Sequence, residues 1–375
     1  MISTSKLSCG KNVELVTPSS RAQSALKVPH SPHKTAITAF AMAATLGCLL
    51  LTQACSAPVA PVTRTRDFPY AFCTLTLNDH AEESTFAACF ERIEKVLHEL
   101  NMHSADSEVS VVNRAAGTGA VPVSDDVREI LREAMELASL TDGLFDPTVG
   151  PLVRLWGVGS ENAHVPKPEE IRSALRLVGW RDIVLDEPAR TVALRRAGMT
   201  LDFGALLKGF AAVEGGRILS ARGVRSAIMD IGGSTLALGS RPEGAPWRIG
   251  LQKPGAPRGT PFAVVQARDE VVNTSGAYEQ FFRANGRRYQ HIIDPRTGYP
   301  VDNGIEAVTV ISSRLRNADG PTLSIMALGV EGGLALAKRL GVDAVIVGSD
   351  GTLHMTPGAS RRFTLLDPTY RIASH

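Results

Sequence analysis

The sequence predicts an α+β fold with mixed, largely antiparallel sheets and packed helices. Three observations favour this class. Two stretches in the first half space their apolar residues as helices do. From residue 226 onward, short β-rich runs dominate and are broken by glycine, proline and asparagine. Helices and strands mix without the strict strand–helix alternation of a parallel sheet.

The first predicted elements are a strand over 70–77 and two helices. The first helix is predicted by apolar residues spaced three or four positions apart: Phe86, Phe90, Ile93, Leu97 and Leu100. The second begins after Ser124, a residue type that suits a helix N-cap. Its apolar stripe is Val127, Ile130, Leu131, Ala134, Leu137 and Ala138.

The later elements are mostly strands. A hairpin is predicted over 182–194 and a helix over 205–221. The β-rich runs that follow cover 226–231, 235–239, 247–252, 262–267, 270–274, 289–293 and 305–312. Two helices, over about 318–328 and 331–340, precede a last strand over 344–348.

The overall composition is that of a globular protein. The chain has 375 residues, of which 44% are apolar and 21% charged, which predicts two domains or one large one. The net charge is only +2, and no basic stripe carries interleaved aromatic residues. Nucleic-acid binding is therefore not indicated.

The N-terminal region predicts export. Residues 35–51 form an apolar run that follows Lys27 and Lys34 and ends at LTQACS, a pattern typical of a secretory signal. Cys55 completes what looks like a bacterial lipoprotein box, so we predict a signal region over 1–54 and lipidation of Cys55. The alternative is a retained membrane anchor, although the run is at the short end of the roughly 17–25 residues that a span needs.

This prediction places the protein in the bacterial cell envelope, as a membrane-anchored lipoprotein facing the periplasm. Residues 55–66 are rich in proline and are predicted to tether a single domain, 67–375, to the membrane. In that domain Cys73 and Cys89 can form a disulfide or remain buried thiols. Their spacing does not decide between the two.

The stretch GLFDPTVGPLVRLWG, residues 143–157, predicts a shaped loop. Phe145 and Trp156 are candidates to stack on a flat ligand, and Asp146 is a candidate acceptor of hydrogen bonds. The alternative is a packed loop with a solvated aspartate.

The stretch TLDFGALLKGFAA, residues 200–212, predicts a strand that ends at Asp202 and a helix that starts just after. Free N–H groups at a helix start, with Lys208 one turn on, suit a phosphate. The alternative is an ordinary turn with an exposed lysine, since the spacing is not that of a Walker loop. The following DIGGS, residues 230–234, permits a close backbone approach or a sheet bulge.

Two further stretches place polar groups after apolar runs. In VVNTSGAYEQFF, residues 271–282, hydroxyls and bare amides stand at a strand end, and the Gly-x-Ser-x-Gly elbow of a hydrolase is absent. HIIDPRTGYP, residues 291–300, has turn chemistry but also carries His291. In RNADGPTLSIMALG, residues 316–329, Asp319 and Thr322 offer oxygen ligands of the kind that Mg²⁺ prefers. The alternative for Asp319 is a helix N-cap.

Taken together and in order, these motifs resemble the FAD:protein FMN transferases of the ApbE family. The similarity spans about 70–350. Its most specific part is HIIDPRTG preceded by TSG. The matching blocks are SADSEVSVVN, GLFDPTVGPLVRLWG, LDFGALLKG, DIGG, NTSGAYEQFF, HIIDPRTG and NAD at 317–319.

The resemblance implies an ApbE-like, T-fold-like architecture and a specific reaction. Such enzymes split the FAD pyrophosphate with the help of Mg²⁺ and move FMN onto a Thr or Ser hydroxyl of another exported protein, releasing AMP. Phosphoryl transfer relies mostly on positioning and charge neutralisation, which fits the residue types above.

The resemblance also implies roles for individual residues. Mg²⁺ would be held by the Ala205 carbonyl, Asp319 and Thr322. His291 would contact FAD or act as the base for the incoming hydroxyl, and Asp319 is the second predicted catalytic residue. The implied FAD contacts are Phe72, His103, Leu144, Phe145, Asp146, Asp202, Lys208, Thr274, Ser275, Gly276 and His291.

The sequence departs from the family pattern at several places, among them LKG for the usual AKG and Val213 where an acidic residue is expected, with Glu214 one place late. Three departures bear on the activity. Phe72-Cys73-Thr74 replaces the usual Met-Gly-Thr, His103 replaces a tyrosine, and Leu323 replaces a threonine close to the metal aspartate. These departures keep two alternatives open. One is a lipoprotein that binds FAD as a store or carrier without transferring it, and the other is a pyrophosphatase that cleaves FAD to FMN and AMP.

Overall fold

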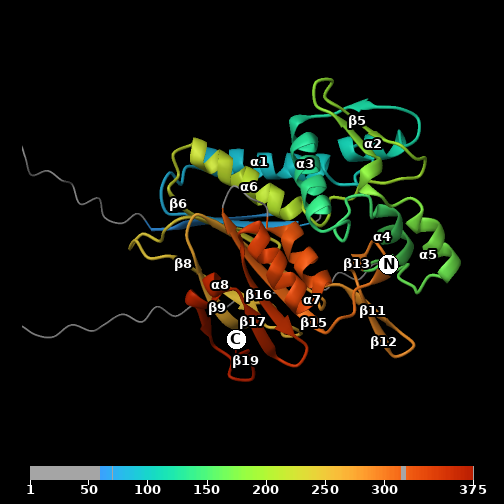
Figure 1. The fold of residues 1–375 in the computed structure, drawn as a ribbon. Coiled ribbons are helices and arrows are strands. Elements are labelled where there is room, and N and C mark those ends of the chain that lie inside the picture. Colours follow the sequence, from blue (N-terminus) through green and yellow to red (C-terminus); the bar gives the residue numbers. More distant parts are fainter. Residues whose placement is uncertain (1–59, 70, 314–317, 375) are drawn as a thin grey trace, which may run out of the picture. The chain divides into compact units, whose positions relative to one another are not determined.

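The computed structural model describes residues 60–69, 71–313 and 318–374 (Figure 1). The predicted signal region 1–54 and the lipidation site Cys55 lie outside the described residues. Strand β1 (Val62–Phe68) pairs along its whole length with β2 (Ala71–Leu77). The predicted tether 55–66 was therefore too long, because its last five residues already belong to the folded domain.

A nine-stranded sheet forms the centre of the domain. Its order is β1, β2, β6 (Ser226–Ile231), β7 (Ser234–Gly239), β10 (Glu270–Gly276), β15 (Ile305–Ser313), β16 (Asp343–Gly348), β17 (Thr352–Met355) and β19 (Arg371–Ile372). All neighbours pair antiparallel except β17 and β19. The predicted α+β class with largely antiparallel sheets is thus confirmed.

Helices cover one face of this sheet (Figure 1). They are α1 (Glu83–Glu99), α6 (Leu207–Ala221) and α7 (Asp319–Leu340). The pleat explains the packing, because alternate side chains of a strand point to opposite faces. In β2, Cys73, Leu75 and Leu77 are fully buried under the helices, while Thr74 and Thr76 belong to the other face.

A second, three-stranded sheet covers part of that other face. It consists of β8 (Trp247–Gln252), β9 (Pro261–Ala267) and β18 (Phe363–Leu365), with α8 (Pro357–Arg361) beside it. Ile249, Leu251 and Phe262 from this sheet share a core with Val272 and Val345 from the large sheet. The domain therefore has two main cores, one on each face of the large sheet.

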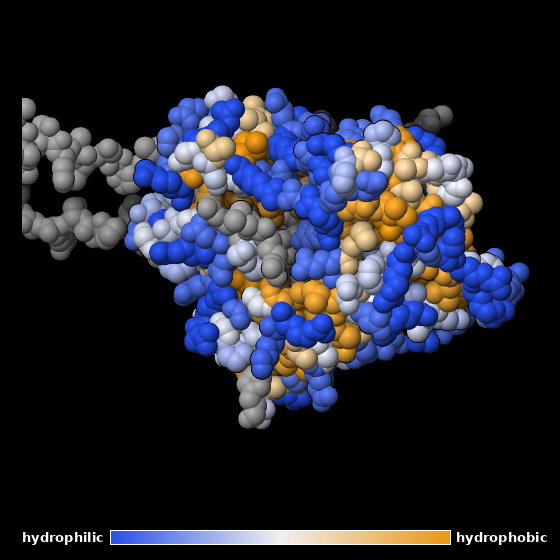
Figure 2. Space-filling model, turned by 45° about the horizontal axis from the view of Figure 1, so that its top comes forward, coloured by the Kyte–Doolittle hydropathy of each residue, from blue (hydrophilic) through white to orange (hydrophobic). Residues whose placement is uncertain are grey.

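The remaining elements surround the helical side. They are α2 (Glu108–Arg114), β3 (Val121–Pro122), α3 (Asp125–Leu140), α4 (Gly150–Trp156), α5 (Pro168–Leu175), the 3₁₀ turn η1 (Trp180–Asp182), β4 (Ile183–Asp186) and β5 (Thr191–Leu194). Two small hairpins, β11 (Phe281–Ala284) with β12 (Arg287–Gln290) and β13 (Ile293–Asp294) with β14 (Tyr299–Pro300), follow β10. Polar residues cover most of the face seen in Figure 2, where hydrophobic residues gather in a few patches.

The predicted helices α1 and α3 are confirmed, with the predicted stripes buried. The Ser124 side chain accepts a hydrogen bond from the Val127 backbone N–H, as an N-cap should. The two late helices form one helix, α7, that is interrupted at Gly329, where φ is 81° and ψ is −176°. Cys73 and Cys89 are both buried free thiols.

Four element predictions were wrong. No strand ends at Asp202, because only Thr200 forms an isolated bridge there, with Val149. Residues 143–157 are not only a loop, since α4 begins at Gly150, with Pro151 in its first turn, where a proline is tolerated. The run 289–293 is split between β12 and β13. The strand over 344–348 is not the last, because β17, β18 and β19 follow it.

Candidate active site

Asp319, the first residue of α7, lies at the centre of a buried polar network. Its carboxylate is almost fully buried, with the residue 4% exposed. Oδ1 accepts a hydrogen bond from Ser234 Oγ at 2.6 Å, and Oδ2 accepts one from the Gly209 backbone N–H at 2.6 Å. Burial raises the pKa of Asp319, and the nearby charge of Lys208 opposes that rise. One carboxylate thus joins α7 to α6 and β7.

Thr322 places a hydroxyl in the same network. Its Oγ1 donates to the Asp319 carbonyl, accepts from Asn273 Nδ2 at 3.1 Å and lies 2.7 Å from Ser275 Oγ. Leu323 instead packs against the apolar core. The hydroxyl near Asp319 therefore comes from position 322 in this chain.

The turn before α6 brings two predicted FAD contacts together. Asp202 Oδ1 accepts from the Gly204 backbone N–H at 2.7 Å, and this bond fixes the turn that precedes Ala205. Burial raises the pKa of Asp202, while the charges of His103 and Arg154 lower it. Asp202 and His103 are therefore electrostatic neighbours, although 99 positions separate them in the sequence.

Lys208 connects this turn to the start of β2. Its Nζ donates to the Gly232 carbonyl at 3.1 Å, and the Gly232 N–H donates to the Phe72 carbonyl at 3.2 Å. Gly232 and Gly233 form the β6–β7 turn with φ of 53° and 98°, a region that suits glycine. The paired glycines therefore make a two-residue hairpin turn and not a bulge.

His291 is half-buried at the end of the β11–β12 hairpin. Its Nδ1 lies 3.2 Å from the Gln280 carbonyl, which also accepts the His291 backbone N–H. Burial lowers the pKa of His291, and the charge of Lys208 lowers it further. Because a carbonyl can only accept, the neutral ring carries its proton on Nδ1 and leaves a lone pair on Nε2.

The turn after His291 closes on itself. Asp294 Oδ1 accepts from the Arg296 backbone N–H at 2.9 Å, and the two side chains form an ion pair. The aspartate and arginine of HIIDPRTG thus stabilise the turn that follows the histidine.

The loop that precedes α4 is held from within. Asp146 Oδ1 accepts from the Thr148 N–H at 2.8 Å and hydroxyl at 2.6 Å, and Oδ2 accepts from the Trp180 N–H at 3.0 Å. Burial raises the pKa of Asp146. Leu144 and Phe145 are also buried. Asp146 is therefore not a solvated side chain but the brace of this loop.

Trp156 cannot stack on a ligand, contrary to the expectation from the sequence. The side chain is fully buried, and its Nε1 donates to the Gly298 carbonyl at 2.8 Å. Its ring packs among Phe282, Tyr289 and Tyr299.

The strand residues predicted to contact FAD lie at the end of β10 and the start of β2. Thr274 pairs with the Thr309 hydroxyl at 2.8 Å. A Cβ at Gly276 would come within 2.4 Å of the Tyr278 ring, so a larger residue there would require this ring to move. Phe72 is 37% exposed, and the Arg258 guanidinium lies 5.4 Å from its ring centre.

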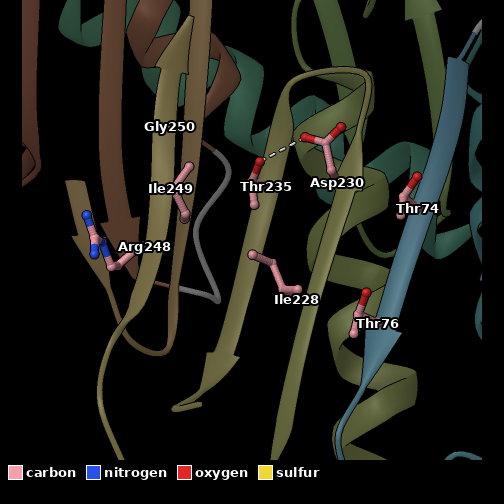
Figure 3. Close-up of a pocket in the computed structure, with 8 residues that line it drawn as sticks. All are labelled: Thr74, Thr76, Ile228, Asp230, Thr235, Arg248, Ile249 and Gly250. Atoms are coloured by element: carbon pink, nitrogen blue, oxygen red, sulfur yellow. Dashed lines mark hydrogen bonds between the residues drawn. The ribbon is translucent and has the colours of Figure 1, made fainter. Parts of the chain in front are cut away.

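A cavity of about 340 Å³ lies elsewhere, between the β2–β6–β7 part of the large sheet and β8 (Figure 3). Asp230 accepts a hydrogen bond from the Thr235 hydroxyl at 2.8 Å in this cavity. Its lining contains none of the predicted site residues: it consists of Thr74, Thr76, Ile228, Asp230, Thr235, Arg248, Ile249 and Gly250.

The model of the ApbE family matches residues 71–346. The chain belongs to the ApbE family. The match begins at β2 and ends in β16, so it includes every element that contributes to the Asp319 network.

Named relatives in the ApbE family cover most of the chain. A protein called FAD:protein FMN transferase from Klebsiella pneumoniae (strain 342) is 35% identical over 80% of this chain and 92% of its own length. One of the same name from Treponema pallidum (strain Nichols) is 34% identical over 72% and 79%. The crystal structure of the Pseudomonas stutzeri flavinyl transferase ApbE has a TM-score of 0.71 at 32% identity, over 80% of this chain and 96% of that one.

Ser234 and Asn273 belong to the hydrogen-bond network around Asp319, but they were not among the site residues predicted from the sequence. Ser234 Oγ lies 2.6 Å from Asp319 Oδ1 and 3.0 Å from Asn273 Oδ1. Both residues are buried polar groups inside strands that otherwise bury apolar side chains. A serine after DIGG and an asparagine within an apolar run were the only signals in the sequence.

Proposed function

We propose that this chain transfers FMN from FAD onto a Thr or Ser side chain of an exported target protein and releases AMP, in a reaction that requires Mg²⁺. One observation carries the proposal. The first turn of α7, the start of α6, the β6–β7 turn and the β10 end meet around the buried carboxylate of Asp319. The charge of Lys208 acts on both this carboxylate and His291, so Lys208 links the two groups. The names of the relatives support FAD as the substrate and a protein as the acceptor.

The residues around Asp319 suit a magnesium ion by their chemistry. The carboxylate of Asp319, the hydroxyl of Thr322 and the carbonyl of Ala205 are all hard oxygen donors. Within the described residues, no cluster of three or more carboxylate, imidazole or thiol groups forms a metal site. A bound Mg²⁺ would neutralise negative charge on the FAD diphosphate.

Side chains of the protein would bind FAD and take up the proton of the acceptor hydroxyl. Asp202 and Lys208 bind FAD, and the Lys208 ammonium attracts the diphosphate. The acceptor hydroxyl oxygen forms a bond to the phosphorus of the FMN half, and the P–O bond to the AMP half breaks. The hydroxyl proton passes to Nε2 of His291, whose Nδ1–H is held by the Gln280 carbonyl.

The proposed location is the periplasmic side of a bacterial membrane, through lipid on Cys55. Only six residues, 56–61, separate Cys55 from β1, which begins at Val62. At roughly 3.3–3.6 Å per residue they reach about 20 Å. The domain would therefore stay close to the membrane surface and act on acceptors held there.

The test incubates the mature chain, beginning at Cys55, with FAD, MgCl₂ and a target protein bearing an acceptor threonine. We expect the target mass to rise by one FMN, and we expect EDTA to abolish the gain. Bound FAD without AMP release would instead support the flavin store, which Leu323 favours. AMP and free FMN without a labelled target would support the pyrophosphatase.

A further inference from the structure

The β11–β12 hairpin carries an exposed aromatic ring between two arginine side chains. Phe281 is 41% exposed. The guanidinium groups of Arg283 and Arg288 each lie 5.8 Å from its ring centre. Arg283 and Arg288 are paired across the hairpin, so both belong to the same face as Phe281.

The opposite face of the hairpin fixes it to the domain. Phe282 and Tyr289 stack on each other at 5.2 Å. Both rings lie against Trp156, at 6.4 and 5.4 Å. The face with Phe281 is therefore free to contact another molecule without loosening the hairpin.

Charge on the Phe281 face is positive. Arg288 forms an ion pair with Glu306 at 2.7 Å, and Arg287, on the other face, pairs with Asp302 at 2.7 Å. Within the described part of the chain, Arg283 makes no ion pair, and the residue is exposed. A partner that covers Phe281 would bring its own carboxylate to Arg283 at low cost, because the arginine keeps its stacking contact.

The base of the hairpin is at His291. Gln280 directly precedes β11, and His291 directly follows β12. The Gln280 carbonyl accepts both the backbone N–H and Nδ1 of His291 at 3.2 Å. A protein seated on Phe281 is thus one residue away from the carbonyl that orients the histidine.

We propose that Phe281, Arg283 and Arg288 form the docking surface for the acceptor protein, and that the acceptor presents an apolar side chain and a carboxylate near its Thr or Ser hydroxyl. The inference rests on the proposed function. Aromatic and arginine side chains are enriched where binding energy concentrates in protein interfaces. Asp202 and Lys208, which we propose bind FAD, lie on other elements. The face of the hairpin with Phe281 is therefore available to bind the acceptor protein.

The experiment compares Arg283→Glu and Phe281→Ser with the wild-type full chain. The probe is the acceptor protein that the wild type labels in the transfer assay. We expect the KM for this acceptor to rise at least about 10-fold in each variant, with kcat changed less than about twofold and FAD affinity unchanged by flavin fluorescence. Raising the salt concentration should raise the wild-type KM more than that of Arg283→Glu.

Arg195→Glu is the matched control. Arg195 is exposed and follows β5, which Figure 1 shows well away from the hairpin. This variant makes the same charge change and should leave the KM for the acceptor unchanged.

Three outcomes would overturn the proposal. An unchanged acceptor KM in both hairpin variants removes the docking role while leaving the transferase function intact. Weakened FAD binding in Arg283→Glu assigns the arginine to the nucleotide instead. Absence of transfer by the wild type overturns the proposed function and, with it, this inference.

Discussion

At the residue scale, Asp319 combines a structural and a proposed metal-binding role that substitution can separate. Asn at this position can still accept from the Gly209 N–H, and its amide can donate to Ser234 Oγ. We expect Asp319→Asn to fold with a melting temperature close to that of the wild type. Mg²⁺-dependent transfer should fall at least about 100-fold, because the charge is gone.

Asp319→Ala is the matched comparison. It leaves the buried Gly209 N–H without an acceptor, while Ser234 Oγ keeps Asn273 Oδ1 as its acceptor. Unfolding in urea should therefore show a loss of about 1–3 kcal/mol. Equal stability of the Asn and Ala variants would contradict the hydrogen-bonding account.

His291 should show its buried state in the pH dependence of transfer. Because burial lowers its pKa, the ring stays neutral and able to accept a proton below the ordinary value of about 6.5. We expect the transfer rate to hold its plateau through that value and to fall only at lower pH. The His291→Ala variant should transfer slowly with a flat profile over the same range.

The lowered pKa of His291 also makes the free energy of unfolding depend on pH. The unfolded chain takes up the proton first as the pH falls, since its histidine has the higher pKa. The contribution of His291 should therefore be fully present above about pH 6.5 and should decline below it. An unfolding series in urea for the wild type and His291→Ala would measure the difference, and a constant difference at all pH values would contradict this.

At the element scale, the interruption of α7 depends on one glycine. Gly329 has φ of 81° and ψ of −176°, a backbone region that other residues essentially avoid. We expect Gly329→Ala to reduce the free energy of unfolding by about 1–3 kcal/mol, measured with urea. Gly119→Ala is the control, because a Cβ there meets nothing within 4 Å and φ is not positive.

Elements with a clear period could be predicted from the sequence, whereas short or irregular ones could not. The apolar stripes that begin at Phe86 and Val127 predicted α1 and α3, because their residues are spaced three or four positions apart. Each stripe is buried against the core along one side of its helix. Helix α4 was missed because seven residues with a proline give too short a pattern. The sequence predicted a strand end near Gly276 and a close backbone approach or bulge at Gly232. It did not predict the contact of Lys208 with the Gly232 carbonyl, because this contact joins segments far apart in the sequence.

At the scale of the whole molecule, Arg92 connects three helices. From α1 it bonds Asp126 of α3 at 2.6 Å and also Glu214 of α6. These carboxylates are largely buried. We expect Arg92→Met to cost about 3 kcal/mol, because among the described residues Glu214 then keeps Arg217 alone as an ion-pair partner. Arg64→Met, which breaks an exposed pair with Glu83, should cost less than about 1 kcal/mol.

The arrangement of the large sheet explains why the site itself was only partly predictable. Strand β10 pairs with β7 and β15, and β2 pairs with β6, across long stretches of sequence. Motif order identified Asp319, Lys208 and His291 as candidates. It did not place Ser234 and Asn273 beside Asp319, because that contact arises only when β7, β10 and α7 come together.

The buried thiols of Cys73 in β2 and Cys89 in α1 can be used to measure local unfolding of the contact between these two elements. Burial raises the pKa of Cys89 to about 12 and that of Cys73 well above its usual value. Thiolates are the reactive form, so an alkylating reagent should modify neither cysteine while β2 and α1 stay packed. The rate of alkylation in the native protein would then measure how often α1 moves away from β2. Bound flavin should lower this rate if it stabilises the packing of α1 on β2.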